Sequence, residues 1–184
     1  MEKKKTLFTV KELTFTAMFA ALLAVCSWIS VPLSVPITLQ TFAVFAAVLL
    51  LGPKCAAASI TVWILLGAVG VPVFAQFKSG ISAVTGPTGG YMVGFLLMPP
   101  IYAFAVKLFG KKTAVKAVSL FVGLIVCYAF GTAWFVKVYT KDTTFGGALK
   151  ICVLPFAAFD IVKLALAVIL EARTGRFVFR SRHA

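Results

Sequence analysis

Apolar residues run along this chain in six long segments separated by short polar stretches. The segments cover residues 12–31, 38–52, 55–71, 89–109, 114–136 and 147–171. A helix that spans a membrane needs about 20 apolar residues, and roughly 17 suffice. The pattern therefore predicts an all-α, polytopic membrane protein, a bundle of six transmembrane helices in one domain over residues 1–184. The second segment is short enough that a partial span is the alternative.

The stretch between the third and fourth segments breaks this pattern. From Gly70 to Tyr91 the chain is too polar and too rich in glycine for a helix in lipid. Irregular backbone at membrane depth is tolerated only where protein or a cavity covers it. Because the stretch also carries apolar side chains such as Phe74, we expect it to fold back as an outer lid over a binding cavity. An ordinary long loop is the alternative.

Composition supports the membrane assignment and limits the chemistry. The chain is 61% hydrophobic and 12% charged, with a mean hydropathy of +1.05, and a soluble domain could not cover its exterior with so little polar surface. The four cysteines lie in or beside apolar runs without C-x-x-C spacing. They are expected to be small buried side chains, so the sequence predicts neither a metal site nor a cofactor.

The distribution of positive charge indicates the topology. The net charge is +13, which could suggest nucleic acid as a partner, but the positions of the basic residues have a better explanation in the membrane. With six spans and a cytoplasmic amino terminus, the outside loops carry only Lys78, Lys137, Lys141 and Lys150, and Lys163 lies within a span. The other 13 of the 18 basic residues are inside, as the positive-inside rule requires. The second segment is therefore expected to cross, with both termini cytoplasmic and no nucleic acid bound.

Two charged residues lie well inside the sixth segment, Asp160 and Lys163. Their i,i+3 spacing places them on the same helix face. An isolated charge at the bilayer centre costs roughly 2.5–3.5 kcal/mol on insertion scales, and intramembrane ions usually mark functional sites. We therefore expect this pair to face a small polar ligand. A structural ion pair that fixes helix packing is the alternative.

Polar and glycine residues also mark the starts of the second and fourth segments. Thr38, Gln40 and Thr41 begin the second segment, where they face either a cavity or the interface. Gly89, Gly90 and Tyr91 open the fourth segment in the motif GPTGGY. Glycines allow close approach of the backbone, and a helix amino terminus favours an anionic group. A helix cap and a plain turn remain the alternatives, and the tyrosine is either an interface anchor or a ring that stacks on a ligand.

The first segment carries small residues at a spacing of four. Ala17 with Ala21, and Ala20 with Ala24, form two small-x-x-x-small patterns. Such faces let another helix approach closely. The partner helix could belong to the same chain or to another subunit.

Four motifs together resemble a known family. They are PITLQTFAVFAAVLLLGPK from Pro36, LLGAVGVPVF from Leu65, GPTGGYMVGF from Gly86 and FDIVK from Phe159. In this order and spacing they are similar to the BioY family, the biotin-specific S components of energy-coupling-factor (ECF) transporters. The resemblance covers nearly the whole chain.

The resemblance implies a substrate, a location and partners. It implies that Asp160 and Lys163 bind the ureido ring of biotin. It also implies that the first-segment alanines dock on a transmembrane coupling subunit driven by two ATPase subunits, in the cell membrane of a prokaryote. The remaining substrate-binding candidates are Thr38, Gln40, Phe74, Gly89, Gly90 and Tyr91. For the biotin carboxylate, Lys78 and the N–H groups near Gly89 are both candidates.

Other function classes fit the sequence less well. The only histidine, His183, lies at the tail, and the chain has no H-E-x-x-H or G-x-S-x-G motif. No enzyme activity is therefore expected. The chain also lacks a Walker motif, so any ATP-driven transport must draw energy from partners. A stand-alone secondary carrier or facilitator for biotin or another small vitamin is the alternative.

Overall fold

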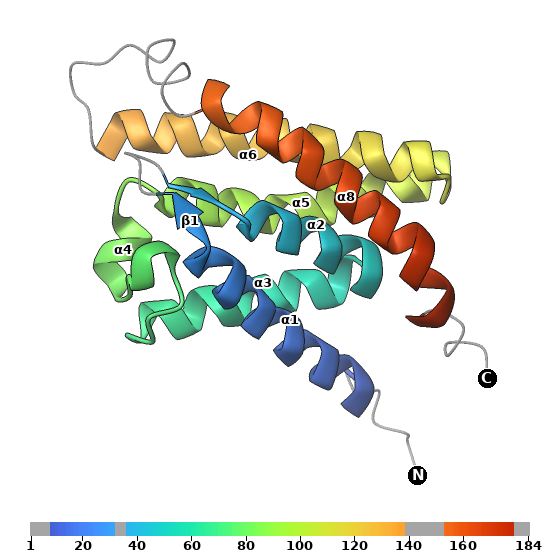
Figure 1. The fold of residues 1–184 in the computed structure, drawn as a ribbon, viewed down its shortest axis with the longest axis horizontal. Helices are drawn as coiled ribbons and strands as arrows, with labels where there is room; N and C mark the ends of the chain where they lie inside the picture. Colours follow the sequence, from blue (N-terminus) through green and yellow to red (C-terminus); the bar gives the residue numbers. More distant parts are fainter. Residues whose placement is uncertain (1–7, 32–35, 139–152, 179–184) are drawn as a thin grey trace.

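The computed structural model describes residues 8–31, 36–138 and 153–178 and shows a bundle of helices (Figure 1). The mostly helical class agrees with the prediction from the sequence. Only one two-stranded ribbon interrupts the helices among the described residues. The elements in chain order are α1 (Val10–Trp28), β1 (Ser30–Val31), β2 (Ile37–Thr38), α2 (Gln40–Leu51), α3 (Pro53–Ala68), η1 (Ala75–Phe77), α4 (Ile81–Thr85), α5 (Gly89–Phe109), α6 (Thr113–Val138) and α8 (Leu154–Val178).

The helix bounds follow the apolar segments, but several ends are shifted: α2 begins at Gln40, α3 ends at Ala68 and α8 continues to Val178. Helix α5 has the bounds expected for the fourth segment, whereas α1 ends at Trp28, earlier than expected. The next residues instead pair in the antiparallel ribbon, with Ser30 opposite Thr38. The start of the expected sixth segment, residues 147–152, lies outside the described residues. Within the described part of the chain, α1, α5 and α6 are long and apolar enough to cross a membrane, and α2 and α3 are shorter apolar helices.

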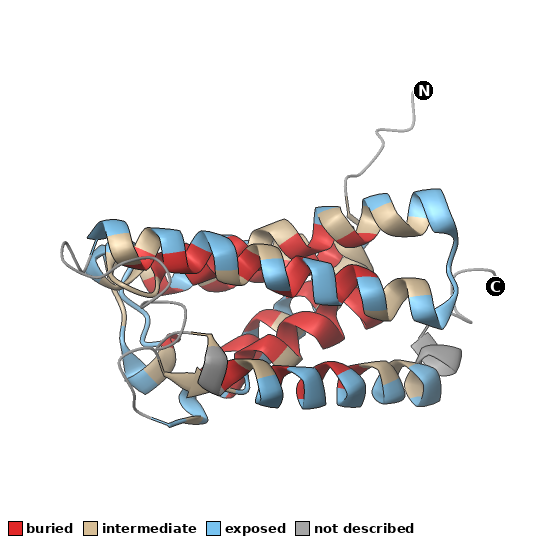
Figure 2. Cartoon of the chain, turned by 90° about the horizontal axis from the view of Figure 1, so that it is seen from above, coloured by how far each residue is buried: buried red, intermediate tan, exposed pale blue. Residues whose placement is uncertain are grey.

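Helix α2 is the centre of the bundle. All of its residues except Phe42 are buried, as expected for a helix that is hydrophobic on every side. It packs against α1, α3, α5 and α8, and buried positions gather on the inward faces of the helices (Figure 2). With 12 residues it is about 18 Å long. Gln40 and Thr41 in its first turn are buried, so these polar groups are held within protein.

Helices α5 and α6 approach each other closely because glycines line their contact. A Cβ atom added at Gly94 would lie 3.0 Å from the Cα atom of Cys127, and one at Gly131 would lie 2.3 Å from Cδ1 of the Tyr91 ring. Small residues permit this kind of close approach between membrane helices. The contact fixes the aromatic ring of Tyr91 against α6.

The segment between α3 and α5 lies at one end of the bundle, together with the β-ribbon. Helix α1 begins and α8 ends at the opposite end (Figure 1). The segment is irregular, as expected, but contains the short helices η1 and α4. We call the end that carries it the α4 end.

Candidate functional site

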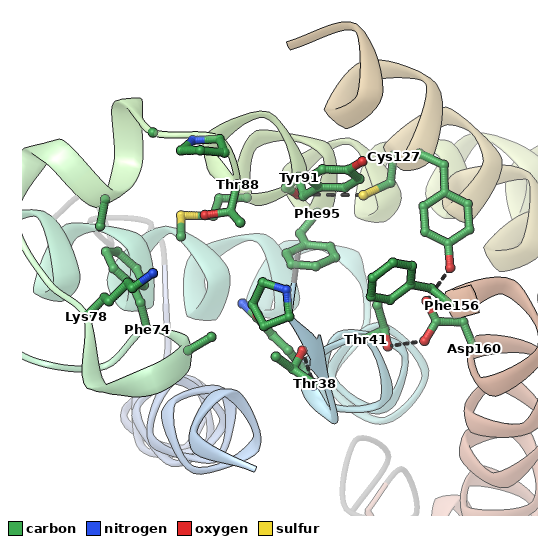
Figure 3. A pocket seen from close by; sticks show the side chains of 18 of the residues that line it. Thr38, Thr41, Phe74, Lys78, Thr88, Tyr91, Phe95, Cys127, Phe156 and Asp160 are labelled. Carbon is green, nitrogen blue, oxygen red and sulfur yellow. Dashed lines mark hydrogen bonds between the residues drawn. The ribbon is translucent and has the colours of Figure 1, made fainter. Parts of the chain in front are cut away.

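A cavity of about 520 Å³ opens at the α4 end of the bundle. Its wall comes from the β-ribbon, the first turn of α2, the segment before α5, and helices α5, α6 and α8. Elements far apart in the sequence therefore converge on one space (Figure 3).

Asp160 and Lys163 are the charged pair at the α8 side of this cavity. Both are buried, with 3% and 8% of their surface exposed. The Lys163 Nζ atom lies 2.6 Å from Asp160 Oδ1, as the i,i+3 spacing predicted. Both residues also line the cavity, so the pair is both a helix-packing element and part of the cavity wall.

The start of α2 completes the surroundings of the lysine. Lys163 Nζ donates to the Thr38 carbonyl oxygen at 2.6 Å and to Thr41 Oγ1 at 3.1 Å. The Thr41 hydroxyl in turn donates to Asp160 Oδ1 at 2.7 Å. Three acceptors thus take the three hydrogens of the ammonium group.

Tyr128 of α6 reaches the same carboxylate from the opposite side. Its hydroxyl donates to Asp160 Oδ2. Together Asp160, Lys163, Thr41 and Tyr128 form what we call the ion cluster. Because its two charges are paired and hydrogen-bonded, the cluster avoids most of the cost of unpaired buried ions.

Gln40 differs from the ion cluster because part of its side chain is unsatisfied. It lines the cavity and is only 7% exposed. Among the described residues its Nε2 group has no hydrogen-bond partner. A buried donor without an acceptor costs about 1–3 kcal/mol. This donor is therefore available to a ligand that brings an acceptor into the cavity.

The structure brings most of the candidate residues together and separates two of them. The cavity wall includes Thr38, Gln40, Phe74, Tyr91, Asp160 and Lys163. Gly89 and Gly90 are not part of it. A Cβ atom at Gly89 would lie 1.8 Å from the Val84 carbonyl oxygen, and one at Gly90 would lie 2.3 Å from Cβ of Trp134. These glycines allow close packing at the start of α5, which is the role the structure gives them.

Thr41, which the sequence placed at either a cavity or the interface, lines the cavity and belongs to the ion cluster. Several other cavity residues were not among the candidates. Phe95 and Phe156 add aromatic surface to the wall, and Tyr128 belongs to the ion cluster. Tyrosines of membrane proteins are usually expected at the interface with water, so Tyr128 did not stand out. The signal that could have found it is its position near the middle of a long apolar run, where a hydroxyl needs a partner in protein.

The two alanine patterns of α1 separate in the structure. Ala17 and Ala21 are exposed, whereas Ala20 and Ala24 are 3% and 6% exposed and belong to the core. The second pattern therefore serves packing within the chain, since buried methyl groups cannot meet another subunit. Only the first pattern remains available to a partner.

Comparison with known proteins places this architecture in a family. The family model described as the BioY family matches residues 1–180. The "Probable biotin transporter BioY" of Pyrococcus horikoshii is 43% identical over 164 residues, which is 89% of this chain and 95% of the relative. The "Biotin transporter BioY" of Thermotoga maritima is 38% identical, again over 89% of this chain and 95% of the relative.

A solved structure agrees with both matches. It is the crystal structure of the S-component for biotin from an ECF-type ABC transporter. The two chains share 26% sequence identity and superpose with a TM-score of 0.82, over 91% of this chain and 92% of the other. The fold, the family model and the identities to relatives all lead to one assignment, and this chain belongs to the BioY family.

Proposed function

We propose that this chain is the high-affinity biotin-binding subunit of an ECF-type, ATP-driven importer, which captures biotin from outside in a membrane-embedded site. The observation that carries the proposal is the charged pair of Asp160 and Lys163, buried and yet part of a cavity wall. The relatives and the matched structure are named for biotin. No chemical transformation is required of the chain, which binds and releases its ligand.

The ureido group of biotin matches the ion cluster in its donors and acceptors. It has two N–H donors and one carbonyl acceptor. Among the described residues, Asp160 Oδ2 accepts a hydrogen bond only from Tyr128 and keeps acceptor capacity, and Gln40 Nε2 is a donor without a partner. The contact from Lys163 to Thr41, at 3.1 Å, is the longest of the lysine. It is the contact that a ligand carbonyl replaces at the lowest cost.

Aromatic side chains suit the apolar part of the ligand. Phe74, Tyr91, Phe95 and Phe156 all line the cavity. The sulfur ring and the hydrocarbon chain of biotin are apolar, and their burial against these rings contributes about 25 cal/mol per Å². The cavity thus combines one polar end with apolar walls, as expected for a small-molecule site.

The proposed topology has six spans, both termini in the cytoplasm, and the α4 end outside. It is supported by the start of α1 and the end of α8, which lie at the end of the bundle opposite the cavity (Figure 1). In this arrangement the segment between α3 and α5 covers the cavity as the outer lid. Helix α2, with 12 residues, is the shortest of the six spans and is surrounded by protein. The location is the cell membrane of a prokaryote.

Docking to the energising module is assigned to the exposed face of α1. Ala17 and Ala21 leave a shallow surface on which a helix of the transmembrane coupling subunit can pack. Two ATPase subunits complete the proposed complex and supply the energy. The chain itself contributes ligand capture and this docking face.

Ligand binding to the purified protein tests the proposed function. In detergent or nanodiscs and without ATP, calorimetric titration should show tight binding of biotin. Thiamine and riboflavin should give no heat of binding at the same concentrations. Failure to bind biotin, or equal binding of all three vitamins, would contradict the assignment.

Docking is tested separately by pull-down with the coupling subunit and its ATPases. The Ala17→Trp, Ala21→Trp double variant should lose the complex and keep biotin binding. Val118→Trp is the matched control, because Val118 is exposed on α6 and has no role in the proposed interface. A double variant that still forms the complex would place the docking face elsewhere.

A further inference from the structure

The charges around the cavity do not balance. Its described lining contains one carboxylate, Asp160, and two ammonium groups, Lys163 and Lys78. The first two neutralise each other at 2.6 Å. Within the described residues Lys78 takes part in no salt bridge or side-chain hydrogen bond. The described lining therefore has one positive charge without a counter-ion, at the side opposite the ion cluster (Figure 3).

Two tryptophans hold the backbone that carries this lysine. We call residues 72–78 the rim turn. Trp28 of α1 donates from Nε1 to the Pro72 carbonyl oxygen at 2.9 Å, and Trp63 of α3 donates to the Val73 carbonyl oxygen at 3.0 Å. Because two different helices fix adjacent carbonyl groups, the start of the rim turn is tied to the bundle.

The same tryptophans pack against the rings of the rim turn. Phe77 stacks on Trp28 with ring centroids 5.2 Å apart, and Phe74 meets Trp63 edge-on at 5.0 Å. Such ring pairs contribute about 0.5–1.5 kcal/mol each beyond their buried area. They hold Gln76 and Phe77 at φ values of 58° and 57°, in the left-handed region that side chains seldom adopt. Backbone strain of this kind persists only where the surroundings enforce it, and it is frequent at ligand clamps.

The alternative group for an anion, the backbone near Gly89, is less available. The Gly89 N–H donates to the Gly86 carbonyl oxygen at 3.1 Å, and the Tyr91 N–H donates to the Thr88 carbonyl oxygen at 3.1 Å. Gly86 is itself held by Trp134, whose Nε1 donates to the same Gly86 oxygen at 3.0 Å. These amide groups are already used, whereas the ammonium of Lys78 is not.

We propose that Lys78, positioned by the rim turn, binds the carboxylate of the ligand and makes the site selective for the free acid over neutral derivatives. The inference rests on the proposed function. Biotin carries its ureido ring and its carboxylate at opposite ends, and the cavity carries the ion cluster and Lys78 on opposite sides. A ligand with one negative charge leaves the occupied cavity neutral.

Comparison of biotin with biotin methyl ester, which lacks the negative charge, tests the proposal. Titration of the wild-type protein should give tighter binding of biotin than of the ester by about 3- to 10-fold, the range expected for a partly solvated ion pair. Lys78→Met should weaken biotin and leave the ester unchanged, so that the two affinities become equal. Lys78→Arg should keep most of the preference. Because salt screens exposed charges, the preference of the wild-type protein for biotin over the ester should decrease when NaCl is raised from about 0.05 M to about 0.5 M.

Lys137→Met is the matched control, since Lys137 is an exposed lysine at the end of α6 and does not line the cavity. It should keep the wild-type ratio. Binding of the ester by Lys78→Met shows that the variant is folded. An unchanged ratio in Lys78→Met, or an equal loss of both ligands, would overturn the role of Lys78 while leaving biotin binding intact. Wild-type protein that binds neither ligand would instead contradict the proposed function.

Discussion

The two sides of the cavity differ in how their charged side chains are compensated. On the α8 side, Asp160 and Lys163 are buried and every hydrogen of the ammonium has an acceptor. On the rim side, Lys78 is exposed and has no such partner within the described chain. A buried charge must be compensated before the ligand arrives, because its desolvation is costly. A charge at the rim keeps its hydration and needs no partner until the ligand binds.

This difference predicts how each side responds to substitution. In the ion cluster, stability and ligand binding depend on the same groups, so removal of one group affects both. On the rim, the ligand contact can be removed without loss of stability. Variants that separate these two effects therefore test the comparison directly.

Asp160→Asn should have the largest effect. The change leaves the buried ammonium of Lys163 without its counter-ion. Breaking a buried pair by removal of one partner costs about 3–5 kcal/mol. Thermal unfolding in detergent should show this loss, and biotin titration should show a marked loss of affinity.

A double variant provides the control for this change. Asp160→Asn combined with Lys163→Met removes the isolated charge and should recover much of the stability without recovering biotin binding. Equal stability of the single and double variants would show that the pair is not held as a compensated buried unit.

Tyr128→Phe should have the second largest effect. It removes the hydroxyl that donates to Asp160 Oδ2 and keeps the ring. A hydrogen bond to a charged group contributes about 1.5–3 kcal/mol, so unfolding temperature and biotin affinity should both fall. Tyr102→Phe is the control, because Tyr102 is a buried tyrosine that does not line the cavity. A loss of stability without loss of biotin affinity would limit Tyr128 to a structural role.

Gln40→Leu should change stability and binding in opposite directions. The empty protein loses a buried donor without a partner, so its stability should rise by about 1 kcal/mol. Biotin affinity should fall because the ligand acceptor loses that donor. Thr16→Val is the matched control, since Thr16 Oγ1 is the other buried group without a partner among the described residues and lies outside the cavity wall. It should gain stability with no change in binding, and the same result for Gln40→Leu would exclude a ligand contact there.

The sequence predicted the helical class and the pair of ions because both depend on local patterns. Apolar runs identify helices for a membrane, and the spacing of Asp160 and Lys163 within one helix determines that they meet. The partners of the pair come from other helices. Thr41 and Tyr128 lie 119 and 32 residues away from Asp160 along the chain. No period within a single segment could indicate which hydroxyl group meets the carboxylate.

The alanine patterns of α1 also show what the sequence alone cannot predict. Ala17 and Ala20 belong to patterns with the same spacing, yet one is exposed and the other is buried. Helix α1 is apolar on both its core-facing and its exposed sides, so hydrophobicity does not distinguish the two faces in a membrane protein. The packing of α1 against α2 and α3 decides which face is covered.

Gln76→Gly should have the smallest effect, and it tests the rim alone. Gln76→Gly removes the strain of a left-handed backbone conformation, which stabilises the folded protein. It also raises the conformational entropy of the unfolded chain, which destabilises the folded protein by a similar amount. The free energy of unfolding should therefore change by less than about 1 kcal/mol. Gln76→Val places a β-branched residue at the same φ of 58° and should destabilise the protein by about 1–3 kcal/mol. Because Gln76 does not line the cavity, Gln76→Gly should keep the ratio of biotin affinity to ester affinity. If the variant binds both ligands equally, the backbone strain itself, and not only the two tryptophans, positions Lys78.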